Sequence, residues 1–176
     1  VIRNLVFQAV SGGISLTNTS NVTIAGNYIG TNAAGTESFG LLGPGIYLSA
    51  STAQIGGTSG VSVGGPCTGD CNLIAGSYGW GGIELRTGST ATIRGNYIGV
   101  NAAGTGATIF NDGTGNGGTI YNDIGILVVS SMATIGGTAA GARNVVSGNL
   151  PGAAIDISWA GTTGNLIAGN YIGTNV

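Results

Sequence analysis

The feature that most constrains this chain is an internal repeat. The pentapeptide Gly-Asn-Tyr-Ile-Gly occurs at 26–30, 95–99 and 169–173 of the 176 residues, with copies spaced by about 70 residues. The first two copies are followed by Asn-Ala-Ala-Gly-Thr at 32–36 and 101–105. Repetition at a fixed period indicates a stacked architecture, in which each unit buries its apolar face against the next.

Each half of the repeat unit contains three short runs in which apolar residues alternate with small or polar ones. In one half the runs lie at 72–75, 82–85 and 91–95. A period of two is typical of a β-strand, and clusters of Gly, Asn, Ser and Thr between the runs indicate turns. No window sustains a helical period, so we expect an all-β chain.

Three strands in every coil predict a three-sided parallel β-solenoid, with about six short coils and residues 1–176 forming a single segment. We expect one aliphatic column to point inward from each side. The predicted members are Val6, Ile29, Ile74, Ile98, Val146 and Ile172 for the first strand; Ile14, Ile46, Ile83, Ile126 and Ile155 for the second; and Ile24, Ile55, Ile93, Ile135 and Ile167 for the third.

A column of asparagines is expected where each coil begins. Asparagine tolerates left-handed turns, and its side chain carries both a donor and an acceptor, so stacked amides can bond along the solenoid. A ligand-binding face is the alternative interpretation. The predicted ladder consists of Asn4, Asn27, Asn72, Asn96, Asn144 and Asn170.

Both ends of the sequence lie within the repeat pattern. The chain opens on Val1-Ile2-Arg3-Asn4 and closes within a copy of the pentapeptide motif. We therefore expect uncapped ends, and a segment that is part of a longer array or a subunit that stacks on its own copies.

These motifs resemble those of a known superfamily. The run Asn144-Val145-Val146-Ser147-Gly148-Asn149, the Ile-Gly-Gly-Thr copies at 55–58 and 135–138, and the Asn-Tyr-Ile-Gly copies are similar to repeats of large secreted bacterial proteins of the pectin-lyase-like superfamily. The resemblance implies a right-handed parallel β-helix and an extracellular or cell-surface location. The superfamily contains polysaccharide lyases and hydrolases, and also adhesins and fibre proteins, so the fold does not decide the activity.

One outward column carries the candidates for polysaccharide chemistry. Glu84 and Asp156 are expected in this column, two coils and roughly 9.6 Å apart, near the separation of an inverting pair of carboxylates. Arg86 lies beside Glu84, and Trp80 and Trp159 could stack on sugars. The alternative is a solvent-exposed surface pair of Glu84 and Arg86, which Leu127 between the two acids favours.

The segment 100–123 contains a partial calcium-loop spacing. Asp112, Thr114, Asn116 and Asp123 occupy positions 1, 3, 5 and 12 of an EF-hand-like loop, although Thr at position 3 and Asp at position 12 depart from the pattern. No cofactor other than calcium is indicated. Chance spacing in a segment rich in Gly, Asn and Asp is the alternative.

Two further residue patterns have local interpretations. Cys67 and Cys71 are expected to form a disulfide within one loop of a secreted protein. Thr and Ser crowd the connection from the second to the third strand, as at 17–20, 49–52 and 87–90, and a regular array would suggest ice binding. These residues are not expected to keep one register between coils, which favours ordinary turn chemistry.

Composition narrows the functional classes. The chain has no His, which excludes Ser/His/Asp triads and histidine metal sites. Four arginines and a net charge of −2 provide no basic surface for nucleic acid, and no run approaches the ~18 apolar residues of a membrane helix.

We expect a non-catalytic structural or adhesive rod that associates end to end with its own copies or with neighbouring repeats. A polysaccharide-active domain that binds carbohydrate is the first alternative, and an ice-binding solenoid is the second.

Overall fold

The computed structural model describes residues 1–59, 65–111 and 121–174 of the chain. Its strands form three parallel sheets, which we call the first, second and third faces. The first face contains β2 (Val6–Phe7), β5 (Tyr28–Ile29), β9 (Leu73–Ile74), β12 (Tyr97–Ile98), β16 (Val145–Val146) and β19 (Tyr171–Ile172). The second face contains β3 (Ile14–Thr17), β7 (Ile46–Ser49), β10 (Gly81–Arg86), β14 (Ile124–Val129) and β17 (Ile155–Ser158). The third face contains β1 (Ile2–Arg3), β4 (Val22–Ala25), β8 (Thr52–Gly56), β11 (Thr90–Arg94), β15 (Met132–Gly136) and β18 (Leu166–Ala168).

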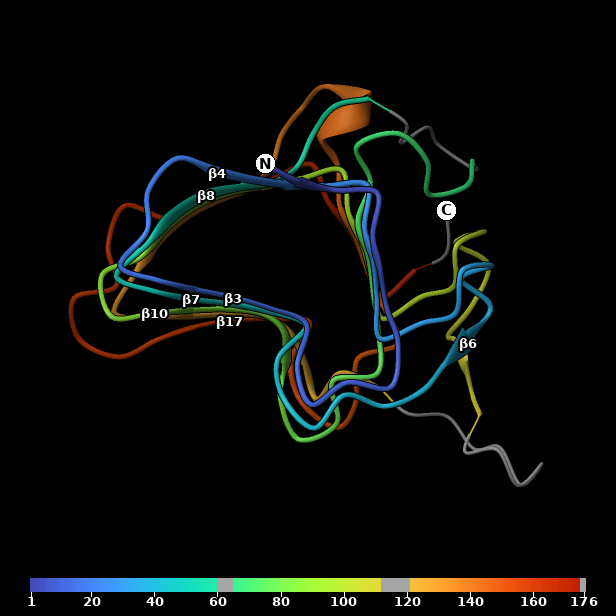
Figure 1. Ribbon diagram of the computed structural model, residues 1–176. Coiled ribbons are helices and arrows are strands. Elements are labelled where there is room, and N and C mark those ends of the chain that lie inside the picture. The colour runs from blue at the N-terminus through green and yellow to red at the C-terminus, as the bar shows by residue number, and fades with distance from the viewer. Residues whose placement is uncertain (60–64, 112–120, 175–176) are drawn as a thin grey trace.

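Successive strands of the chain belong to successive faces, so each strand pairs with a strand from a neighbouring turn of the chain. Figure 1 shows the resulting three-sided outline, with β4 and β8 on one side and β3, β7, β10 and β17 on another. The all-β prediction is confirmed, because the helical content of the described residues is one short 3₁₀ turn, η1 (Ala140–Ala142). The arrangement is consistent with the predicted three-sided β-solenoid.

A pair of two-residue strands lies outside the three faces. β6 (Glu37–Ser38) pairs in parallel with β13 (Ile109–Phe110). Figure 1 shows β6 away from the three-sided body, on an arm that the chain forms between the first and second faces. The arm comes from the first two copies of the segment that follows the pentapeptide repeat, so sequence repetition here extends to repeated structure.

The core lies between the three faces and is built from aliphatic columns. Ile46 and Ile126 both pair with Ile83 on the second face, and Ile55 and Ile135 both pair with Ile93 on the third, as predicted. All six side chains are fully buried. Burial of an isoleucine contributes about 1.5–3 kcal/mol, so columns of this kind supply the main stabilisation.

The predicted column of the first strand is wrong at its first member, Val6. Phe7, and not Val6, pairs with Ile29, while Val6 pairs with Tyr28 and is 48% exposed. The cause is the turn just before the strand, since Asn4 has a φ of +59° and Gly26 one of +66°. Asn4 therefore takes the left-handed turn position that Gly26 holds in the next coil. The register of β2 against β5 is consequently one residue away from the predicted register.

Candidate functional site

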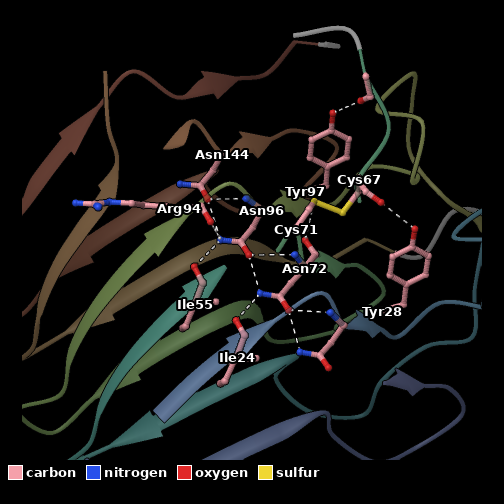
Figure 2. Close-up of a disulfide and its surroundings, with 12 residues drawn as sticks. Ile24, Tyr28, Ile55, Cys67, Cys71, Asn72, Arg94, Asn96, Tyr97 and Asn144 are labelled. Atoms are coloured by element: carbon pink, nitrogen blue, oxygen red, sulfur yellow. Dashed lines mark hydrogen bonds between the residues drawn. A yellow bond between two sulfur atoms is a disulfide. The ribbon is translucent and has the colours of Figure 1, made fainter. Parts of the chain in front are cut away.

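A column of hydrogen-bonded asparagines joins the coils at the corner between the third and first faces (Figure 2). The backbone N–H and side-chain Nδ2 of each asparagine donate to the Oδ1 of the next one along the solenoid. These paired distances are 3.0 and 3.0 Å from Asn27 to Asn72, 3.3 and 2.8 Å from Asn72 to Asn96, 3.0 and 2.9 Å from Asn96 to Asn144, and 3.1 and 2.8 Å from Asn144 to Asn170.

Each of these amides also bonds to the third face. Nδ2 of Asn72 donates to the carbonyl of Ile24 at 2.9 Å, and Nδ2 of Asn96 donates to the carbonyl of Ile55 at 3.0 Å. We call the column of Asn27, Asn72, Asn96, Asn144 and Asn170 the Asn ladder. Asn4 is not part of it, because the N–H that donates to Asn27 Oδ1 belongs to Leu5.

The other two corners carry polar columns that sequence reasoning missed. Between the second and third faces, backbone N–H groups donate to hydroxyls of the next coil, from Thr19 to Ser51, from Ser51 to Ser89 and from Ser89 to Ser131, at 3.1, 3.3 and 3.2 Å. The expectation that these hydroxyls do not keep one register is therefore wrong. The available signal was the recurrence of Ser two positions before the inward Ala53, Ala91 and Ala133.

The corner between the first and second faces has a shorter polar column. The N–H of Ser77 donates to Asn122 Oδ1 at 3.0 Å, and Asn122 Nδ2 donates to Asn149 Oδ1 at 2.9 Å. Both asparagines are buried. Buried amides of this kind require partners, since an unsatisfied polar group costs about 1–3 kcal/mol.

The outward column of the second face contains Glu84 in the predicted register, between Tyr47 and Leu127, and Leu127 in turn pairs with Asp156. Glu84 is only 2% exposed. Its Oε1 accepts the N–H of Gly81 at 2.8 Å, and its Oε2 accepts Nη2 and Nε of Arg86 at 3.0 and 3.2 Å. The solvent-exposed surface pair weighed from the sequence is wrong for Glu84, because this carboxylate is buried and bonded to the N–H of Gly81, at the start of β10, and to Arg86.

The two tryptophans do not form one surface. Trp80 precedes the first residue of β10, whereas Trp159 follows the last residue of β17, so they lie at opposite ends of the parallel strands of the second face. Trp159 is 78% exposed. The structure thus separates the candidates for sugar stacking, and it leaves Asp156 two strands away from Glu84.

The calcium candidates Asp112, Thr114 and Asn116 lie outside the described residues. Asp123 is described, and its Oδ1 accepts the N–H of Gly79 at 2.9 Å. Across 1–59, 65–111 and 121–174, no three His, Cys, Asp or Glu side chains gather closely enough to hold a metal ion. The calcium loop therefore stays a prediction.

Cys67 and Cys71 form a disulfide, as predicted. Both are buried against the outer side of the first face, in a small cluster with Leu73 and Tyr97. Figure 2 shows how the Tyr28 hydroxyl donates to the carbonyl of Cys67, at 3.1 Å. Burial raises the pKa of the Tyr28 and Tyr97 phenols, which therefore remain neutral donors through the ordinary pH range. The disulfide thus closes a short loop, residues 67–71, against the outer side of the first face.

We expect the Cys67→Ala/Cys71→Ala double variant to lose about 2 kcal/mol of unfolding free energy, because the bond closes only a short loop and the entropic gain grows with loop length. Urea denaturation of the variant and of the oxidised wild type measures the difference. Reduced wild type serves as the control and should match the variant. Equal stability of the variant and the oxidised wild type would show that the disulfide does not fix the loop.

A groove lies at the corner between the first and second faces. It has a volume of about 460 Å³ and is lined by Tyr78, Gly79, Tyr121, Asp123, Leu150 and Pro151. The groove carries no signal in the sequence, because its lining comes from three turns that are far apart along the chain.

Comparison with protein-family models, with curated proteins and with solved structures finds no match to this chain. The resemblance to the pectin-lyase-like superfamily therefore depends on the repeat motifs, and the three parallel faces are compatible with it. None of the helices in the described part of the chain is long and apolar enough to cross a membrane.

Proposed function

We propose that the chain is a non-catalytic structural or adhesive rod, formed by a right-handed parallel β-helix segment of a secreted or cell-surface protein. The observation that carries this proposal is the Asn ladder, whose members are joined by hydrogen bonds along the solenoid axis. Columns of Ser hydroxyls and of further asparagines connect the other two corners. A rod needs this axial connection, and the environment of Glu84 is what disfavours an active site.

The environment of Glu84 supports a structural role for the outward column. Both oxygens of this buried carboxylate accept hydrogen bonds from the chain itself, and Arg86 neutralises its charge. Leu127 stands between Glu84 and Asp156 in the sheet register. This geometry is suited to anchoring a turn, and a polysaccharide lyase or hydrolase site is the less favoured candidate.

Self-association would proceed through the outermost strands. Ile167 and Ile172 belong to the inward columns and are 44% and 50% exposed, whereas their neighbours Ile135 and Val146 are fully buried. A further coil would cover these side chains and pair with the open strand edges. The coil can come from a longer array or from a second copy. The disulfide agrees with an oxidising, extracellular compartment.

Two measurements test the proposal. Incubation with pectic and other acidic polysaccharides should release no reducing or unsaturated ends, and release would contradict the non-catalytic role. Electron micrographs of concentrated protein should show end-to-end fibres. Discrete monomers at high concentration would contradict self-stacking.

Ice binding is a second candidate, and one observation favours it. On the outer side of the third face, Thr92 pairs with Thr134 and with Gln54, while Thr52 pairs with Thr90. This is a partly regular array of hydroxyls at the strand spacing of about 4.8 Å. Thermal hysteresis of the purified protein tests it, and freezing at the equilibrium melting point without hysteresis would rule it out.

A further inference from the structure

We propose that the groove at the corner between the first and second faces binds a small organic cation, specifically the head of an alkylammonium compound. The groove is the one lined by Tyr78, Gly79, Tyr121, Asp123, Leu150 and Pro151. Its volume of about 460 Å³ lies in the range of small-molecule sites. Cation binding at this groove is separate from the rod function and does not depend on it.

The groove is assembled from three stacked turns. The N–H of Asp123 donates to the carbonyl of Trp80 at 3.0 Å, and the N–H of Gly152 donates to the carbonyl of Asp123 at 2.9 Å. The N–H of Leu150 donates to the backbone carbonyl of Asn122 at 3.0 Å. Backbone hydrogen bonds between the turns therefore hold the walls of the groove in place before any ligand arrives.

The turn that carries Tyr78 is fixed from both sides. Ser77 donates its N–H to the buried Asn122, and Gly81 donates its N–H to the buried Glu84. Arg86 neutralises Glu84 from the opposite side of the carboxylate. The buried pair of Glu84 and Arg86 thus positions the turn that carries Tyr78.

The lining has the chemistry that an organic cation requires. Tyr78 is 66% exposed, so its ring is available for contact, and Tyr121 lines the same groove. Aromatic faces attract cations through their quadrupole. Asp123 supplies a carboxylate whose Oδ1 is held by Gly79 at 2.9 Å, and Leu150 and Pro151 supply apolar surface for the alkyl groups.

The same lining disfavours the two obvious rivals. No Arg or Lys is among the residues that line this groove, so the Asp123 carboxylate would repel an acidic polysaccharide. A neutral sugar could bond to Asp123 and to the tyrosine hydroxyls, but it leaves the charge of Asp123 uncompensated and presents hydroxyls to the apolar side chains of Leu150 and Pro151. A quaternary ammonium head needs a negative charge, aromatic rings and apolar contact, and the lining contains residues of all three kinds.

Titration with tetramethylammonium chloride, with sodium chloride at equal ionic strength as reference, tests the site. The fluorescence of Trp80, which lies two residues after Tyr78, and chemical shifts of the Gly79 amide report binding. We expect saturation with a dissociation constant on the order of 1 mM. Parallel titrations with choline, phosphocholine and a trimethyl-lysine peptide distinguish the sources of the same head group.

Two variants separate charge from aromatic contact. Asp123→Asn keeps an oxygen for the Gly79 N–H and should weaken binding about tenfold, and Tyr78→Ala should weaken it by a similar factor. Asp156→Asn removes a carboxylate outside the groove, and Trp159→Asn removes an exposed aromatic at a left-handed position that Asn tolerates. Both controls should bind like wild type.

Three outcomes would overturn the proposal. One is the absence of a saturable response to tetramethylammonium. Another is equal affinity in the Asp123→Asn variant and wild type, which would show that the charge is not used. The third is displacement of the cation by a neutral disaccharide at lower concentration, which would identify the groove as a sugar site.

Discussion

Replacement of Asn96 by alanine should reduce the free energy of unfolding by about 4 kcal/mol, since each buried polar group left without a partner costs about 1–3 kcal/mol. Asn96 is fully buried at the centre of the Asn ladder. Its Oδ1 accepts from the N–H and Nδ2 of Asn72, and its Nδ2 donates to Asn144 and to the carbonyl of Ile55. Alanine leaves these groups without a partner, where water cannot replace the amide. Urea denaturation of the variant and wild type measures the loss.

The same substitution at the outermost rung is the matched control. Asn170 accepts from Asn144 and donates to the carbonyl of Ile135, but it is only partly buried. Water can satisfy the groups that Asn170→Ala frees, so we expect a loss of about 1 kcal/mol. Losses of equal size at the two positions would mean that the ladder does not stabilise the solenoid through buried hydrogen bonds.

Removal of Arg86 should have the second-largest effect. Arg86→Met keeps most of the aliphatic stem but leaves Glu84, 2% exposed, without its cation. Breaking a buried ion pair on one side costs about 3–5 kcal/mol, and we expect about 3 because the Arg86 side chain is one-third exposed. Arg3→Met is the control, since Arg3 pairs with Asp70 at the surface and such pairs contribute about 1 kcal/mol or less.

A double variant separates the charge from the packing. Glu84→Gln/Arg86→Met removes both charges, and Gln can still accept the N–H of Gly81. Its stability should return to within about 1 kcal/mol of wild type, because replacing a whole buried pair is often neutral. If the double variant is as unstable as Arg86→Met alone, the loss comes from packing and not from an uncompensated carboxylate.

The inward columns could be predicted because they depend on local periodicity. A period-2 run places Ile83 and Ile93 inside wherever the strands lie, and the repeat aligns them with Ile46 and Ile55. The prediction fails at Val6, since the register there is decided by the backbone conformation of Asn4. Asparagine serves in this fold both as a ladder residue and as a left-handed turn residue, and the sequence letter does not distinguish the two.

The candidate sites were harder to predict, because burial depends on what the turns cover. Glu84 is in the expected column, but its carboxylate bonds back to the N–H of Gly81 at the start of β10, and no periodicity encodes that contact. The Ser column at the corner between the second and third faces was missed, because hydroxyls that accept from backbone N–H groups resemble ordinary turn residues in the sequence. The groove beside Tyr78 brings together the equivalent turns of three successive coils, which are far apart in the sequence, so only the three-dimensional stacking reveals it.

Buried amide hydrogen bonds along the axis hold the coils together, and native-state hydrogen exchange measured by NMR is the direct test of this role. The backbone N–H groups of Asn72 and Asn96 donate to side chains of the next coil and are fully buried, whereas Tyr78 lies on an exposed turn. We predict that the two asparagine amides exchange only through global unfolding, with protection equal to that of Ile83 and Ile93. Exchange of the Asn72 and Asn96 amides at the rate of the Tyr78 amide would show that the Asn ladder does not hold the coils together.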